Sequence, residues 1–387
     1  MQTWVRLSIA GGATLLVGMG IGRFSYTPLI PALIDGGALS SSQAGYVSAF
    51  NLAGYLFGAL AAIRVGALWG EIRILKACLL ISLLCLLASI VDFGFVWLAF
   101  WRFLVGVTVA VMMIYSLAIV TRHAPPERLG RATGVVFTGV GIGILLSGWL
   151  VPALLDLSLV AAWVGMSAIG LLGVIVGFWG WRCGGYEKPR LDDKRGSGSI
   201  EGPRITLPIL RLIGAQTMFS IGLVPHTIYW VDYLVRGLGH DIGFGGFHWV
   251  LFGLGAISGT YLWGRLADAV GFRSGLVLVF VVLAIGVALP VLEIQHWALI
   301  ASSLLVGAQP GFSAIIAGRT HQIVGPDYMA QVWRWMMLTS GVFQAIGGYI
   351  YVTLFDITEN YTLIFLIGGS AMALGAMISM LPAHSRR

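Results

Sequence analysis

Apolar residues in this chain form continuous stretches of about 20 residues, separated by short polar connections. A helix that crosses a bilayer needs about 20 apolar residues, whereas a membrane β-strand alternates apolar and polar residues over about 10 positions. The pattern therefore predicts an all-α integral membrane protein and excludes a membrane barrel. The twelve predicted spans cover residues 7–34, 40–63, 74–92, 97–121, 129–151, 158–181, 205–235, 246–264, 274–292, 297–318, 328–352 and 360–381.

Composition narrows the class of protein further. Of the 387 residues, 58% are hydrophobic and only 10% are charged, whereas a soluble globular domain carries about 25% charged residues. A soluble enzyme is therefore excluded. The formal net charge of +7 does not indicate nucleic-acid binding, because the positive residues form no basic helix face or groove. The sequence contains no GxxxxGK[ST], GxSxG or HExxH pattern and no cysteine spacing typical of metal sites. We predict no catalytic residues, metal or cofactor.

The positions of lysine and arginine predict how the chain is oriented. If the N-terminus is inside, the outside connections hold only Arg236, and two more of the 23 basic residues, Arg23 and Arg102, lie within spans. The remaining 20 fall in inside segments. Because cytoplasmic loops of membrane proteins are enriched in Lys and Arg, we expect a multi-pass protein with both termini in the cytoplasm.

A polar segment at 183–204, rich in Gly, Pro and charge, predicts a cytoplasmic linker between an N-terminal half (1–182) and a C-terminal half (205–387). The two halves resemble each other at an offset of about 200 residues. Together with the span count, these matches indicate duplicated six-helix halves, an arrangement in which substrate binds at the midplane between them. The matching positions are Gly58 and Arg64 with Gly259 and Arg265, Gly148 with Gly348, and Gly20-Ile21-Gly22 with Ser220-Ile221-Gly222.

The connection between spans eight and nine reads GRLADAVGFR at 264–273. It resembles the signature loop of the major facilitator superfamily, in which an acidic residue and a basic residue across a tight glycine turn can form a charge lock. The first-half copy at 64–73 has Ala67 where the acid is expected. The resemblance implies a cytoplasmic gate at Gly264, Asp268, Gly271 and Arg273.

Other segments support the same resemblance. Arg102 and Gly106 resemble the buried arginine motif of the superfamily, and 134–148 resembles the glycine motif of its antiporters without the usual proline. The segments 20–33 and 222–239 resemble the YbfB/YjiJ branch. The resemblance implies the major facilitator fold, with twelve transmembrane helices in two pseudo-symmetric six-helix bundles, and a transporter of the bacterial inner membrane. It supplies no substrate.

Arg23 is the most informative single residue, because it lies near the middle of the first span. An arginine at that depth costs about 2.5–3.5 kcal/mol on insertion scales, so it must face a partner or a wet cavity. Tyr26 and Thr27 share its helical face at i+3 and i+4. Arg23 is either an anchor for an anionic substrate or a lock on helix-end carbonyls or a buried acid.

His226 and Thr227 occupy the repeat positions of Tyr26 and Thr27, and the preceding Pro225 predicts a kink in span seven. Because histidine titrates near neutral pH, His226 is a candidate proton carrier. The alternative is a hydrogen-bonded imidazole in the core.

Five further residues have two interpretations each. Asp232 and Arg236 are spaced as an i,i+4 ion pair, which is either an outer gate or a site of proton coupling. Arg102 either serves substrate or proton coupling, or packs against a neighbouring helix. Tyr229 and Trp230 lie on the helical face of His226, where they either stack on a planar substrate or pack in the core.

The sequence therefore predicts a monomeric secondary active transporter that works by alternating access, with no partner beyond protons, its solute and the lipid bilayer. The cationic site favours a small organic anion of the carboxylate type, coupled to H⁺. Alternatives are an exporter of amphipathic or drug-like compounds, an uncoupled uniporter and a non-transporting membrane sensor. The predicted substrate-binding residues are Arg23, Tyr26, Thr27, His226, Tyr229, Trp230 and Arg102, and the coupling or gating residues are His226, Asp232 and Arg236.

Overall fold

The computed structural model describes residues 2–182 and 205–381, and helices make up most of these two ranges. No strand occurs in these two ranges, so the predicted all-α class is confirmed. The predicted linker at 183–204 lies outside the described residues.

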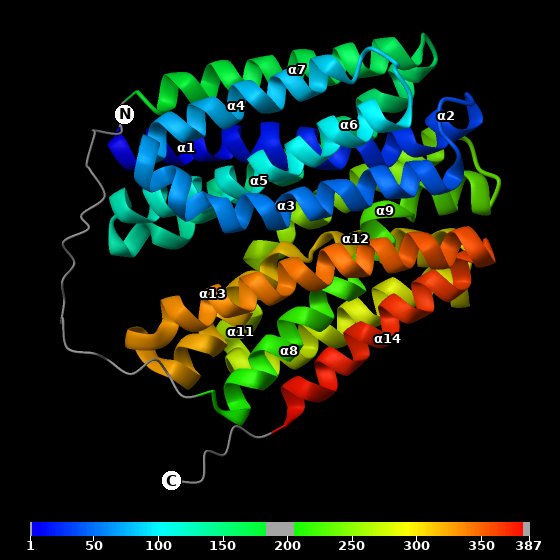
Figure 1. The fold of residues 1–387 in the computed structure, drawn as a ribbon. Coiled ribbons are helices and arrows are strands. Elements are labelled where there is room, and N and C mark those ends of the chain that lie inside the picture. The colour runs from blue at the N-terminus through cyan, green and yellow to red at the C-terminus, as the bar shows by residue number, and fades with distance from the viewer. Residues whose placement is uncertain (1, 183–204, 382–387) are drawn as a thin grey trace.

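The N-terminal half forms one layer of the molecule, the blue-to-green upper layer in Figure 1. Glycine and proline interrupt its first span, as described below, whereas the long apolar stretches between the other connections form uninterrupted helices. The elements are α1 (Thr3–Leu15), η1 (Leu16–Arg23), η2 (Phe24–Leu29), α2 (Ile30–Asp35), α3 (Ser41–Trp69), α4 (Glu71–Ala88), α5 (Phe95–His123), η3 (Pro126–Arg128), α6 (Leu129–Leu155) and α7 (Leu159–Gly180).

The C-terminal half forms the second layer, coloured from green to red in Figure 1. The two layers meet along two long helix pairs, α3 with α13 and α6 with α11. The elements are α8 (Leu207–Gly222), α9 (Val224–Ile228), α10 (Trp230–Asp232), η4 (Tyr233–Gly237), α11 (Ile242–Leu292), α12 (His296–Gly307), α13 (Pro310–Thr358) and α14 (Tyr361–Met380).

Within the described ranges, nine helices are long and apolar enough to cross a membrane, or ten if the two helices His296–Gly307 and Pro310–Gly325, bent by 44°, form one span. Helix α4 is absent from this count and carries three charged residues in its first two turns. The 51-residue α11 leaves helical geometry at Gly271, where φ is 80°. The count of twelve spans therefore stays a prediction.

Glycine contacts repeat between the two halves. A Cβ atom on Gly54 of α3 would lie 2.0 Å from the Phe103 carbonyl oxygen of α5. In the C-terminal half, a Cβ atom on Gly255 of α11 would lie 2.5 Å from the Leu304 carbonyl oxygen of α12, 201 positions later in each case. Such contacts let helix backbones approach closely. Two further pairs repeat at the same offset, Gly58–Val107 with Gly259–Ala308 and Gly106–Asn51 with Gly307–Phe252.

Replacing Gly54 with alanine is expected to destabilise the protein by about 1–3 kcal/mol or more, because backbone atoms of α5 occupy the space of the new methyl group. Gly130 provides the matched control: a Cβ atom there meets nothing within 4 Å, and alanine is favoured over glycine in a helix. Thermal unfolding in detergent should place Gly54→Ala below the parent and Gly130→Ala at or above it. Equal unfolding temperatures for Gly54→Ala and the parent would contradict this packing.

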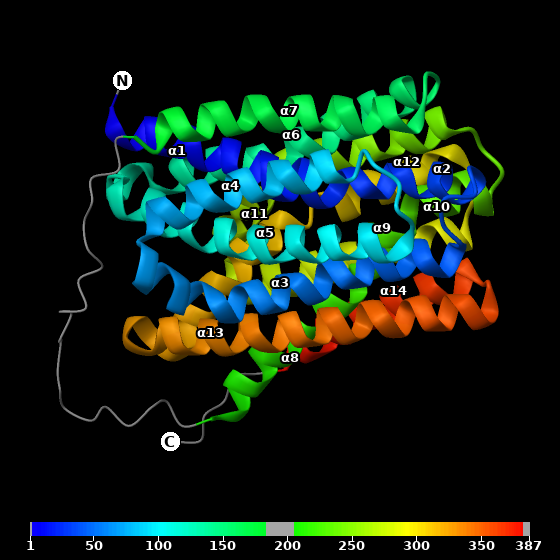
Figure 2. The ribbon, with the colours of Figure 1, turned by 45° about the horizontal axis from the view of Figure 1, so that its top comes forward.

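The first turn of α1 and the last turn of α14 lie toward the same end of the molecule (Figures 1 and 2). Two arginines bind carbonyl groups at this end. Arg6 donates to the Trp179 carbonyl at 2.5 Å, and Arg273 donates to the Met380 carbonyl at 2.5 Å. We call this the basic end, since the arginine-rich connections predicted to be cytoplasmic lie here.

Candidate functional site between the two halves

The first span is broken beside Arg23. Helix α1 ends at Leu15, residues 16–23 form a wider π-helix, and residues 24–29 form a tight 3₁₀ segment. Gly20 lies against Gly143 of α6, where a Cβ atom would come within 2.8 Å of the Gly143 Cα. Pro28 has no backbone N–H to donate. Small residues and proline therefore release backbone carbonyls from the regular helical pattern at the depth of Arg23.

Arg102 of α5 satisfies these carbonyls. Its Nη1 donates to the Gly22 carbonyl at 2.5 Å, and its Nη2 donates to the Arg23 carbonyl at 2.7 Å. Its guanidinium lies over the ring of Tyr26 at 4.8 Å, and the residue is 2% exposed. The Arg102 backbone is held in turn, because Asn51 of α3 donates its amide to the Arg102 carbonyl at 2.8 Å. Arg102 thus fixes the broken first span to α5.

Arg23 has a different environment, although it is also buried, at 8% exposure. Its guanidinium carbon lies 5.3 Å from the ring centre of Phe24 and 5.7 Å from that of Tyr55. Its side chain forms no hydrogen bond or ion pair with any residue of the described ranges. A buried cation held only by aromatic rings retains most of its capacity to bind an anion.

Arg23 faces a small cavity of about 20 Å³ between the two halves. That volume is enough for about one water molecule, so a metabolite would bind here only after the surrounding helices move apart. The lining contains two arginines and no acidic residue: Arg23, Phe24, Tyr26, Thr27, Ser48, Asn51, Leu52, Arg102, Thr227 and Ile228. We call this cavity the central pocket.

The seventh span is broken at the corresponding place, as Pro225 predicts. Helix α8 ends at Gly222, α9 begins at Val224, and a further irregularity follows at Tyr229. The two broken spans touch directly, because the Thr27 hydroxyl donates to the Thr227 carbonyl at 2.8 Å. Two interrupted helices meeting at the interface of a structural repeat are typical of solute sites in membrane transporters.

The aromatic face of span seven lies elsewhere. Trp230 is fully buried and stacks on His226 with ring centres 4.7 Å apart, and Tyr229 packs against Phe355. His226, Tyr229 and Trp230 are absent from the lining of the central pocket. The rings that contact His226 and Trp230 belong to the C-terminal half, whereas the Tyr229 hydroxyl lies at the interface of the halves, 3.4 Å from where a Cβ atom on Gly45 of α3 would stand. The structure therefore brings Arg23, Tyr26, Thr27 and Arg102 together, and leaves these three predicted site residues apart from them.

At the end of the molecule opposite the basic end, polar side chains join the two halves. Arg236 lies 3.3 Å from Asp35 and 3.4 Å from Asp232, so the predicted i,i+4 pair is present and extends across the interface. The second carboxylate oxygen of Asp232 accepts a hydrogen bond from Tyr361 at 2.6 Å. Ser42 and Asp356 also form a hydrogen bond between the halves. We call this set of contacts the outer closure.

Comparison with known proteins identifies the family to which the chain belongs. Residues 15–380 match the family described as "Uncharacterised MFS-type transporter YbfB". This chain belongs to that family of MFS-type transporters. Membership confirms the resemblance seen in the sequence, and it confirms the expectation that the protein is not an enzyme.

A curated relative of this transporter from Haemophilus influenzae, described as "Putative metabolite transport protein", is 22% identical over 262 residues. The match covers 62% of the transporter and 62% of the relative, so the chain spans less than two thirds of that protein.

Solved structures show the same fold. A D-xylose-proton symporter aligns with a TM-score of 0.73 at 14% identity, covering 97% of both chains. A POT family transporter in complex with a thioalcohol-conjugated peptide aligns with a TM-score of 0.76 at 12% identity, covering 97% of this transporter and 94% of that chain. A bacterial homologue of the human lysosomal transporter Spinster, inward-facing and unoccupied, gives 0.64 at 17% identity, covering 96% and 94%.

The signature loop of the transporter lies at the basic end. Gly271 adopts φ 80° and ψ 155°, a conformation that favours glycine and reverses the chain between the two parts of α11. Arg273 binds the last carbonyl of α14, and Asp268 is exposed. A Cβ atom on Gly264 would meet nothing within 4 Å. The loop thus ties α11 to α14, while its carboxylate faces outward in this arrangement.

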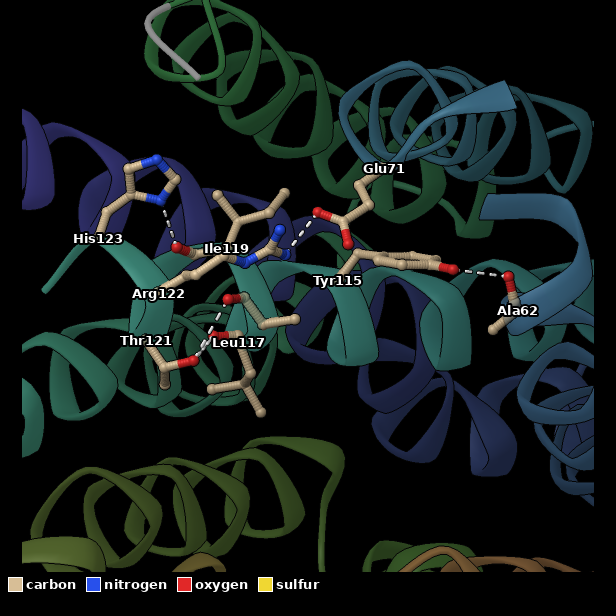
Figure 3. A network of polar contacts seen from close by, with 9 residues as sticks. Ala62, Glu71, Tyr115, Leu117, Ile119, Thr121, Arg122 and His123 are labelled. Atoms are coloured by element: carbon tan, nitrogen blue, oxygen red, sulfur yellow. Dashed lines mark hydrogen bonds and ion pairs between the residues drawn. The ribbon is translucent and has the colours of Figure 1, made fainter. Parts of the chain in front are cut away.

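The first-half copy has its own charge pair, although Ala67 replaces the expected acid. Gly70 adopts φ 83° at the repeat position of Gly271, and the next residue, Glu71, forms an ion pair with Arg122 of α5 at 2.6 Å. Figure 3 shows this pair beside Tyr115, whose hydroxyl donates to the Ala62 carbonyl of α3 at 2.7 Å. Glu71 therefore joins α4 to α5 at this end.

Three polar residues that sequence reasoning overlooked lie around His226. They are His248 of α11 and the adjacent Ser302 and Ser303 of α12, all at most 1% exposed. His248 stands only three residues into predicted span eight (246–264), so it resembles an interfacial residue in the sequence. The sequence feature that indicates these residues is the pair of serines within the apolar run ALIASSLLVG.

Proposed function

We propose that this MFS-type transporter moves a small organic anion of the carboxylate class across the membrane by alternating access, with H⁺ as the coupling ion. One observation carries the proposal: the Arg23 guanidinium is buried at the interface of the halves, faces the central pocket and has no hydrogen-bond or ion-pair partner in the described ranges. An unpaired charge inside a membrane protein is costly and is retained where it meets a substrate or ion.

The chemistry of the pocket favours an anion. Two guanidinium groups line it and no carboxylate does. A cationic solute would therefore meet no opposite charge in the pocket, and a neutral solute would gain nothing from the two positive charges. Arg102 is occupied by backbone carbonyls, and this leaves Arg23 to form the paired hydrogen bonds that hold a carboxylate. Hydroxyl and amide groups of Thr27, Ser48 and Asn51 supply further polar contacts.

Alternating access accounts for the small volume of the pocket. The outer closure joins the halves at one end through the Arg236–Asp35 ion pair and the Ser42–Asp356 hydrogen bond, and such exposed contacts are individually weak. Breaking them requires no change in helix structure. We propose that rocking of the halves about the α3–α13 and α6–α11 contacts exposes Arg23 to either side in turn.

We also propose that the protein is a monomer in the bacterial inner membrane with both termini in the cytoplasm. In this orientation the basic end lies inside and the outer closure lies outside. The distribution of lysine and arginine along the sequence supports this orientation.

Export of amphipathic compounds is the second candidate. It was suggested by the aromatic face of span seven, and it receives less support because Tyr229 and Trp230 do not line the central pocket and pack against other aromatic rings. An uncoupled uniporter shares the anion site and differs only in proton movement. A membrane sensor would depend on the 183–204 segment, which lies outside the described residues.

Proteoliposomes containing a trapped pH dye test the proposal. Adding carboxylates one at a time outside should change the internal pH for at least one of them, because an H⁺-coupled carrier moves protons with its solute. Arg23→Gln should remove that signal, while liposomes without protein set the background. Carboxylate flux without a pH change would identify a uniporter. A response to neutral amphiphiles alone, retained in Arg23→Gln, would overturn the proposal in favour of the second candidate.

A further inference from the structure

Two buried histidines in the C-terminal half each use one ring nitrogen and leave the other without a partner. His226 Nε2 lies 2.8 Å from the Ser302 hydroxyl, and His248 Nδ1 lies 2.9 Å from the Ser303 hydroxyl. His226 Nδ1 and His248 Nε2 have no hydrogen-bond partner in the described ranges. The two residues are 0% and 1% exposed. Buried polar atoms rarely lack a hydrogen-bond partner, so these two ring nitrogens require an explanation.

The serine hydroxyls define the state of His226. Ser302 donates its only hydroxyl hydrogen to the Gly286 carbonyl at 2.6 Å, so it can only accept from the imidazole. His226 therefore carries its hydrogen on Nε2 and presents a bare lone pair on Nδ1. That lone pair can accept a proton. The rings of Trp230, Phe252 and Phe365 surround the imidazole.

Trp230 lies between the two imidazoles. Its ring stacks on His226 and meets His248 edge-on with centres 6.0 Å apart, and its Nε1 donates to the Ser303 hydroxyl at 3.2 Å. The two histidine–serine pairs therefore form one cluster, made from α9, α10, α11 and α12. We call it the histidine–serine cluster.

The cluster extends toward the end that bears the outer closure. Phe244 contacts His248, with ring centres 4.6 Å apart, and it also contacts His240 at 4.0 Å and His296 at 5.5 Å. His296 is exposed and His240 is half-buried. Phe244 thus connects His248 to two further titratable side chains, His240 and His296.

The cluster also touches the central pocket through the backbone. Thr227, the residue after His226, accepts the hydrogen bond from Thr27 and lines the pocket beside Arg23. A change at His226 is thus one residue away from the contact between the two broken spans.

From this geometry we infer that the histidine–serine cluster is the proton-binding site of the transporter, loaded from the side of His240 and His296. The inference rests on the proposed function, of which it specifies the coupling site. Protonation of His226 adds an N–H at Nδ1 that finds no acceptor in this arrangement, so acid favours an arrangement in which the halves have moved. The outer closure should therefore open more often at low pH, as expected when a ligand binds one conformation better than another.

Cysteine labelling measures this opening without any solute. In a chain with Cys78, Cys85 and Cys183 replaced by alanine, Val352→Cys reports on the outer closure, because Val352 is 1% exposed and lies against Gly45 of the other half. Ile357→Cys, at a residue that is 77% exposed, corrects for the pH dependence of thiol reactivity. Maleimide labelling of purified protein in detergent would be followed from pH 8 to pH 5.

The corrected labelling rate at position 352 is expected to rise about tenfold on acidification, which corresponds to a one-unit difference in proton affinity between the two arrangements. His226→Gln and His248→Asn should remove the rise, because each amide replaces the bonded ring nitrogen and cannot titrate. His123→Gln is the control, since His123 lies on α5 and bonds only to its own helix, at the Ile119 carbonyl. Should His226→Gln prove unstable, His248→Asn carries the test.

A rate that does not depend on pH, or a rise that persists in both variants, would overturn the inference. Neither result bears on anion binding at Arg23, because no solute is present. Conversely, loss of the acid-induced rise in labelling in either variant would support proton binding at the cluster, even if Arg23→Gln left anion transport unchanged.

Discussion

Arg23→Gln should weaken carboxylate binding by about 100-fold, which corresponds to the loss of charge-assisted hydrogen bonds worth about 1.5–3 kcal/mol each. Without ligand, the same variant should unfold at the temperature of the parent or above it, since the substitution removes a buried charge that has no partner in the described ranges. Thermal unfolding in detergent, with and without carboxylates, measures both effects in one experiment.

Arg23→Lys separates charge from geometry. Lysine keeps the positive charge and loses the planar fork that holds both carboxylate oxygens. We expect it to retain part of the affinity, between the parent and Arg23→Gln. If Arg23→Lys bound carboxylates as weakly as Arg23→Gln, the planar fork alone would account for the affinity. Unchanged binding in Arg23→Gln would contradict the role of Arg23 as the anion anchor.

Arg102→Gln should behave in the opposite way. Its guanidinium bonds the Gly22 and Arg23 carbonyls at 2.5 and 2.7 Å in a site where it is 2% exposed. Removing it leaves two buried carbonyls of the broken span without their donor, at a cost of about 2–5 kcal/mol. The unliganded protein should therefore unfold at a clearly lower temperature.

Arg334→Gln is the matched control for this loss, because Arg334 is an exposed arginine on α13, and exposed charges contribute little to stability. It should unfold with the parent. If Arg102→Gln also unfolded with the parent, the assignment of Arg102 as the residue that fixes the broken first span would be wrong. The two buried arginines, which look alike in sequence, are thus distinguished by the sign of their effect on stability.

Much of the fold follows from the sequence because a bilayer imposes simple requirements. Continuous apolar runs predicted the helices, and the glycine match of residues 58 and 259 predicted a repeat that recurs in the α3–α5 and α11–α12 contacts. The span count is harder to fix. Glu71, Arg73 and Lys76 lower the apolar character of α4, and glycine turns such as Gly271 join helices that the sequence separates.

The site was only partly predictable. A lone arginine at mid-span marks a costly position in the sequence, and Arg23 does lie at the interface. Sequence spacing places Tyr229 and Trp230 on the face of His226, yet it cannot say which bundle interior that face meets. Local breaks at Leu223 and Tyr229 interrupt this helix, and Trp230 and His226 meet rings of the C-terminal half. The partners of His226 come from Ser302, far along the chain, so no local pattern could reveal them.

Arg23 is proposed above all as a buried cation whose guanidinium is free to bind an anion. The most direct measurement is a thermal-shift screen of the parent and Arg23→Gln, run in parallel against mono- and dicarboxylates and their uncharged amide analogues, since a bound ligand raises stability by mass action. At least one carboxylate should stabilise the parent, its amide should not, and Arg23→Gln should respond to neither while remaining as stable as the parent. A carboxylate shift of full size in Arg23→Gln would contradict the assignment of Arg23 as the anion anchor.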